Sequence, residues 1–150
     1  MLITILIIVN NVIFFSLGLL HFYWAAGGEW ALRGAIPTAF TDTFFDPKRL
    51  IATRLATLVV AIGLFAFGYI TLTHLEDIPK MIPQLWLNIA TLAIAAIFLL
   101  RAIGNFDYCG FFSKDGTDEF SKRDRAIYSP LCLYLSLSTW IIFFQINIIH

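Results

Sequence analysis

The chain has 150 residues, of which 59% are hydrophobic and only 13% are charged, and its net charge is zero. Ordinary soluble domains carry about a quarter charged residues. Here the charges are also segregated, because four stretches contain no Asp, Glu, Lys or Arg: Met1–Phe22, Leu55–His74, Met81–Leu100 and Ala126–His150. Each is about as long as the roughly 20 residues that a helix needs to cross a bilayer. These patterns exclude a soluble domain. They predict an all-α integral membrane protein, a single domain over residues 1–150 that forms a four-helix bundle with spans at about 2–24, 50–73, 81–101 and 129–149.

The first predicted span carries two amide side chains, Asn10 and Asn11, near the middle of the membrane. Unpaired amides are costly there, so at least one should face another helix. We interpret them as packing contacts between helices, with a ligand contact as the alternative. The span ends in His21–Trp24, whose rings are of the kind that settle at the membrane interface.

The second and third spans are predicted to form an antiparallel hairpin, because the loop between them is short. Asp46-Pro47 is typical of a helix start, with Asp as the N-cap and Pro at the first helical position. Small residues such as Gly63 and Gly68 let a neighbouring helix approach closely. We therefore expect these two helices to pack tightly against each other.

The connection from Arg101 to Pro130 holds ten of the twenty charged side chains and is rich in glycine and aromatic residues. This composition predicts a structured loop rather than a plain connector. Thr117, followed by two acidic residues, is typical of a helix N-terminus and predicts a short surface helix at about 118–126. Ser129-Pro130 is interpreted as the N-cap and first position of the fourth span.

The basic residues are distributed unevenly between the loops. Nine of the ten lie in or beside the first and third connections, and only Lys80 lies in the second. By the positive-inside rule, both long connections face the cytoplasm, and both termini and the short second loop lie outside. Cys109 and Cys132 are then at or near the cytoplasm, where thiols stay reduced, and we interpret them as structural.

Two blocks of sequence resemble a known family. They are LHFYWAAGGEWALRGAIPT at the end of the first span, and RAIGNFDYCGFF with FSKRDRAIYSPLCL around the start of the fourth. Both are similar to blocks in a bacterial family of small four-helix membrane proteins, the domain-of-unknown-function family numbered 3995. The resemblance covers nearly the whole chain in order. It implies the same fold and membrane location, and no known activity.

The candidate site residues gather where the first and third connections meet at one membrane face. Polar groups among aromatics at helix ends are a reasonable site hypothesis in a membrane protein. The candidates for ligand binding are His21, Trp24, Glu29, Arg101, Asn105, Asp107, Tyr108, Asp124, Tyr128 and Ser129. The structural alternative is that Arg101 pairs with Asp107 or Asp124 and ties the loop to the helix ends.

His21 could be a general base, a metal ligand or a simple hydrogen-bonding group. His74 and His150 are expected at the opposite membrane face, so they cannot complete a bis-histidine haem site with His21. No spacing of His, Cys or acidic residues matches a known metal site, and Gly27-Gly28 lacks the lysine of a phosphate-binding loop. We expect no metal and no cofactor.

The leading functional hypothesis is a non-enzymatic protein of the bacterial cytoplasmic (inner) membrane. It would bind a lipid or a small amphipathic molecule, or serve as an accessory subunit of a larger membrane complex. The expected partners are membrane lipids and other membrane subunits, with no nucleic acid. The alternative is a membrane enzyme acting on a lipid-soluble substrate, with His21 and a carboxylate such as Asp107 or Glu29 as acid and base.

The orientation has a direct test. A cysteine introduced in the loop at 76–79 should react with a membrane-impermeant thiol reagent applied to intact cells, because this loop is expected outside. The native thiols should react only after the cells are opened. Labelling of the third connection from outside, with the second loop protected, would reverse the predicted topology.

Overall fold

The structure is a computed structural model that describes residues 1–75, 78, 81–104, 109–112 and 119–149. Its long helices are α1 (Leu2–Ala25), α3 (Leu50–Leu72), α4 (Gln84–Ile103) and α6 (Ser129–Ile149). Shorter elements join them: the 3-10 helix η1 (Leu32–Gly34), α2 (Thr38–Phe44), α5 (Glu119–Arg123) and the π-helix η2 (Asp124–Tyr128). Within the described residues, four helices are long and apolar enough to cross a membrane, and there is no β-strand. The prediction of an all-α fold with four membrane-spanning helices is confirmed.

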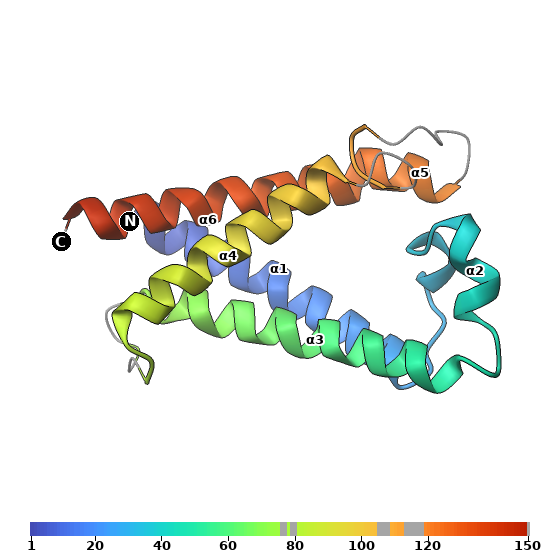
Figure 1. The fold of residues 1–150 in the computed structure, drawn as a ribbon. Coiled ribbons are helices and arrows are strands. Elements are labelled where there is room, and N and C mark those ends of the chain that lie inside the picture. Colours follow the sequence, from blue (N-terminus) through green and yellow to red (C-terminus); the bar gives the residue numbers. More distant parts are fainter. Residues whose placement is uncertain (76–77, 79–80, 105–108, 113–118, 150) are drawn as a thin grey trace.

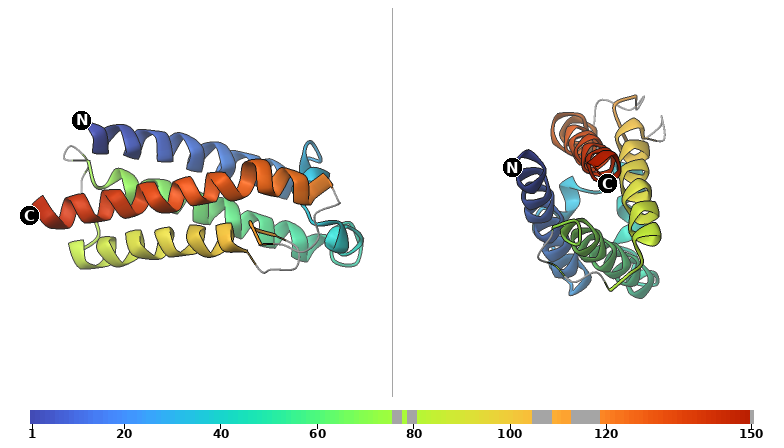
Figure 2. Two further views of the ribbon diagram at one scale, coloured as in Figure 1. Left: turned by 90° about the horizontal axis from the view of Figure 1, so that it is seen from above. Right: turned by 90° about the vertical axis from the view of Figure 1, so that its left-hand side faces the viewer.

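The long helices form two antiparallel pairs, α1 with α3 and α4 with α6. Both termini lie at one end of the bundle, together with the end of α3 and the start of α4, whereas α2 and α5 lie at the other end (Figure 1). The two pairs cross near the terminal end and diverge toward the end that carries α2 and α5, as further views also show (Figure 2). The helices of the two pairs are therefore farther apart at the end that carries α2 and α5 than at the end with the termini.

The expected tight packing of the second and third spans is wrong. α3 packs mainly on α1 and touches α4 little. Near their connection, the His74 Nε2 atom lies 2.8 Å from Thr91 Oγ1, and beyond this point the two helices diverge (Figure 1). The physical reason is that the small face of α3 is already used. A Cβ atom at Gly68 would lie 3.2 Å from the ring of Phe15 on α1, so this glycine admits α1 rather than α4.

Buried polar side chains connect the helices in the apolar interior, as expected for the two asparagines of α1. The Asn11 amide donates a hydrogen bond to Thr71 Oγ1 on α3 at 3.0 Å. The Ser138 hydroxyl on α6 donates to Asn10 Oδ1 at 2.9 Å, which links the two helix pairs. Groups that would be costly to leave unpaired in an apolar interior thus hold neighbouring helices in register.

The apolar core lies where the two pairs meet. It consists of residues from all four long helices: Phe14, Leu64, Ile94, Phe98 and Leu135. The Phe14 and Phe98 rings are 5.6 Å apart, and Phe67 packs edge-on against both rings. Many large apolar side chains on the outer surface are exposed, as a surface in contact with lipid requires.

The start of α3 differs slightly from the prediction. Asp46 Oδ1 does accept a hydrogen bond from the Lys48 backbone N–H at 2.9 Å, in the manner of a cap. However, residues 47–49 form a turn, and the regular helix begins at Leu50. The Asp-Pro signal therefore marks a turn that leads into the helix rather than its first residue.

The prediction that Ser129-Pro130 begins the fourth span is also wrong in detail, because no new helix starts there. The helix continues from Glu119 through Ile149, and its turn at Asp124–Tyr128 is widened to a π-helix, in which the Ser129 N–H bonds the Asp124 carbonyl. Proline cannot donate a backbone hydrogen bond, and its ring clashes with the carbonyl four residues earlier. A widened turn accommodates Pro130 without ending the helix. The predicted surface helix at 118–126 is thus the first part of this longer helix, while its cap at Thr117 lies outside the described residues.

Two glycines close the chain back onto the end of α4. Gly104 and Gly110 both have positive φ values, 82° and 93°, and the Phe111 N–H donates to the Ala102 carbonyl at 3.0 Å. A Cβ atom on either glycine would collide with the backbone of the other segment. Both positions therefore require glycine, for conformation as well as for space.

Gly110→Ala should destabilise the fold by about 2 kcal/mol or more, because it adds a backbone collision to a strained φ. Gly63→Ala is the matched control: a Cβ there meets nothing within 4 Å, and alanine favours a helix by up to about 1 kcal/mol. Unfolding by a denaturing detergent, followed by circular dichroism, measures both. Equal stability of the two variants would contradict the described closure.

Candidate ligand-binding site

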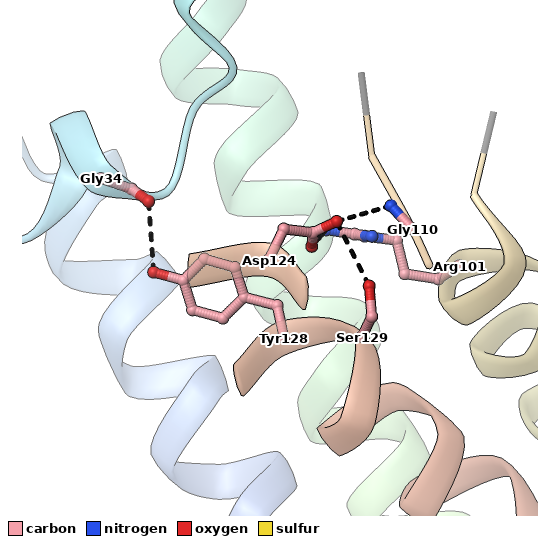
Figure 3. A network of polar contacts seen from close by, with 6 residues as sticks. All are labelled: Gly34, Arg101, Gly110, Asp124, Tyr128 and Ser129. Carbon is pink, nitrogen blue, oxygen red and sulfur yellow. Dashed lines mark hydrogen bonds and ion pairs between the residues drawn. The ribbon is translucent and has the colours of Figure 1, made fainter. Parts of the chain in front are cut away.

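A fully buried carboxylate, Asp124, organises the end of the bundle that carries α2 and α5. It accepts a hydrogen bond from Arg101 Nη2 on α4 at 2.7 Å, in an ion pair, and another from the Gly110 backbone N–H. The Ser129 hydroxyl donates a third, at 3.2 Å. Figure 3 shows these groups converging on Asp124 from α4, from the chain after it and from the start of α6. A buried charge with three donors is fully compensated.

The π-helix explains how Asp124 reaches its partners. Asp124 and Ser129 are five residues apart, and a turn with i to i+5 periodicity places such residues on one side of the helix. The residue directly before Ser129, Tyr128, projects to a different neighbour, and its hydroxyl donates to the Gly34 carbonyl of η1 at 3.3 Å (Figure 3). One turn of helix thus holds both long connections at this end.

A cavity of about 660 Å³ lies between the two helix pairs, beside this network. Its lining is mostly apolar: Leu17, Leu20, Ala31, Ala35, Val59, Val60, Gly63, Leu64, Phe67, Ile97, Phe98 and Leu131. Five side chains that carry a nitrogen, oxygen or sulfur atom also line it: His21, Trp24, Arg101, Tyr128 and Cys132. These five polar side chains lie near the ends of α1 and α4 and at the start of α6, so one end of the cavity is polar. The other end is apolar and reaches the contact between Phe67 and Phe98.

Hydrogen bonds fix the orientation of the aromatic side chains in the lining. His21 Nδ1 lies 2.8 Å from the Leu17 carbonyl, which can only accept, so Nδ1 carries the hydrogen. The Trp24 indole N–H donates to the Trp30 carbonyl at 2.8 Å. The His21 and Trp24 rings meet edge to face, with centroids 4.9 Å apart. These side chains are held in place from within the chain rather than left to move freely.

The structure brings together six of the predicted site residues and separates others. His21, Trp24, Arg101 and Tyr128 line the cavity, and Asp124 and Ser129 lie behind Arg101 in the network. Glu29 instead lines a second, much smaller pocket of about 50 Å³ with Gly27 and Arg54. Three candidates lie outside the described residues: Asn105, Asp107 and Tyr108.

Some lining residues were not among the predicted candidates. Gly63 was interpreted as a close-packing position, yet a Cβ there would meet only open space. Phe67 looked like any apolar residue of a span, and Cys132 like a structural thiol. Nothing in the one-dimensional pattern distinguishes them, because they line a cavity only through the divergence of the helix pairs.

In the part of the chain that the structure describes, no three His, Cys, Asp or Glu side chains group closely enough to hold a metal ion. Of the two partners expected for Arg101, Asp124 is the one the structure pairs with it. The structural interpretation of this pair therefore has direct geometric support.

The fold and this site define a four-helix integral membrane protein with a cavity between two helix pairs. The family model described as "Protein of unknown function (DUF3995)" matches residues 14–139, so the chain belongs to this family, as the resemblance predicted. Comparison with curated proteins and with solved structures gave no match.

Asp124→Asn should lower the free energy of unfolding by about 2 kcal/mol or more, because it leaves the half-buried Arg101 guanidinium without its counter-charge. The matched control is Glu119→Gln, which removes the exposed partner of Arg123. Exposed pairs contribute little, so this change should cost less than about 0.5 kcal/mol. Thermal unfolding in detergent measures both, and similar effects of the two changes would contradict a structural role for Asp124.

Proposed function

We propose that this protein binds a lipid or a small amphipathic molecule in the cavity between its two helix pairs. The observation that carries the proposal is the cavity itself. Its volume of about 660 Å³ lies in the range of small-molecule sites, and its apolar lining with a few polar groups at one end is typical of them. An amphipathic molecule would place its apolar part against Phe67 and Leu64 and its headgroup near Arg101.

The surroundings of the cavity support access from the bilayer. Val59, on α3, has 68% of its surface exposed, and Ile97, on α4, has 48%. Both line the cavity, and α3 and α4 diverge at this end (Figure 1). The opening between these helices would face lipid acyl chains, so a lipid-soluble molecule could enter sideways without crossing water.

The distribution of basic residues supports one orientation of the bundle in the membrane. The basic residues of the described chain gather at the end with η1, α2 and α5, which supports a cytoplasmic position for this end by the positive-inside rule. The headgroup would then lie near the cytoplasmic surface, in the bacterial inner membrane that the family resemblance implies.

The enzyme alternative requires a carboxylate beside His21. Among the described candidates, Glu29 lines the other pocket, and Asp124 is engaged with Arg101, Gly110 and Ser129. Asp107 lies outside the described residues. Binding is therefore the function that the described geometry supports best.

Filling the cavity tests the proposal. Gly63→Phe places a ring in open space within the lining. Ala66→Phe is the matched control, since it adds the same ring to an exposed position of the same helix outside the lining. We expect Gly63→Phe to lose the lipid-soluble molecule that copurifies with the wild-type protein, and Ala66→Phe to retain it.

The measurement is mass spectrometry of organic extracts from equal amounts of the three proteins, purified in a mild detergent. Melting temperatures confirm that Gly63→Phe remains folded. Recovery of the same molecules in the same amounts from all three proteins would show that the cavity holds none of them.

A further inference from the structure

The hydrogen-bonding capacity that remains in the cavity restricts the headgroup that fits there. The Trp24 N–H and the Tyr128 hydroxyl already donate to backbone carbonyls. His21 donates through Nδ1 to the Leu17 carbonyl. In the described part of the chain, no residue hydrogen-bonds to His21 Nε2, and none to Arg101 Nη1. Nη1 is enclosed by the protein itself, whereas His21 lines the cavity, so His21 Nε2 is the nitrogen left for a ligand, with the Cys132 thiol as a weak hydrogen-bonding group nearby.

His21 offers an acceptor. With its hydrogen on Nδ1, the neutral imidazole presents a lone pair at Nε2. A ligand that meets this atom must bring its own O–H or N–H group. An ionised carboxylate has none and would face the lone pair directly.

The charge at the polar end is already balanced. Arg101 is the one formally charged side chain among the described residues that line the cavity, and Asp124 pairs with it at 2.7 Å. An added anion would make this end net negative in surroundings of low dielectric, which is costly. A neutral headgroup does not carry that cost.

The volume of the cavity matches an amphiphile with one hydrocarbon chain. A methylene group takes up about as much space as a water molecule in the liquid, about 30 Å³. A cavity of about 660 Å³ has room for one acyl or alkyl chain with its headgroup.

We infer that the ligand is a single-chain amphiphile with an uncharged, hydroxyl-bearing headgroup, whose O–H donates to His21 Nε2 at the end of the cavity where Arg101 is already paired with Asp124. This inference rests on the proposed function, since it specifies the molecule that the same cavity takes. The hydrocarbon chain of the ligand extends from this headgroup toward Phe67.

Three probes of equal chain length test it: a primary alkanol, its methyl ether and the corresponding fatty acid, ionised at about pH 7.5. Each is titrated by calorimetry into the wild-type protein in lipid nanodiscs, with empty nanodiscs as the reference. The alkanol should bind about five- to ten-fold more tightly than the ether or the fatty acid, because only it can donate a hydrogen bond to His21 Nε2.

Two variants separate the role of His21 from its effect on folding. His21→Phe keeps a ring but removes the acceptor, and should reduce alkanol affinity to that of the ether. His21→Gln restores an acceptor oxygen and should recover most of the preference. A wild-type preference for the fatty acid would overturn the inference in favour of an anion held by Arg101.

Failure of the inference and failure of the proposed function are distinguishable. If none of the probes binds while Gly63→Phe still loses a copurifying molecule, the headgroup or chain inferred here is wrong and the cavity remains a binding site. If Gly63→Phe loses nothing, the binding function itself is wrong.

Discussion

A carboxylate with no exposure to solvent must be compensated where it lies, and much of this structure follows from that requirement at Asp124. Its partners come from α4, from Gly110 and from the start of α6, so satisfying it fixes three segments at once. The π-turn that accommodates Pro130 places Asp124 and Ser129 on one side of the helix. The same arrangement holds Arg101 at the rim of the cavity, with its charge already balanced.

The second determining feature is the choice of helix partners. The close approach at Gly68 and the hydrogen bond from the buried Asn11 amide to Thr71 join α1 to α3. In the other pair, the Ser136 hydroxyl of α6 donates to the Ala95 carbonyl of α4 at 2.8 Å. With these faces used inside each pair, little remains to hold α3 against α4. The pairs are connected at the terminal end, where Ser138 meets Asn10, and they diverge at the other, which leaves a cavity rather than a closed core.

The sequence was sufficient for the helices, because charge-free stretches are a local signal. It was insufficient for helix pairing: the short loop after α3 suggested a partnership with α4, although Gly68 packs against α1. The role of Gly63 could not be read for the same reason, since an identical residue type can admit a helix or border a cavity. Asp124 was recognisable as a partner for Arg101, but its bond to the Gly110 N–H depends on a closure between residues that only three-dimensional structure reveals.

Native mass spectrometry of the wild-type protein, released gently from its own membrane, shows whether a small molecule occupies the cavity between the two helix pairs. We expect one adduct per chain, with the mass of a single-chain, uncharged amphiphile, that survives removal of the detergent. A bare chain, or a series of adducts with the masses of bulk phospholipids, would contradict a specific site between the helix pairs. A stable assembly with other proteins and no small adduct would contradict it as well, and would make this end of the bundle an interface.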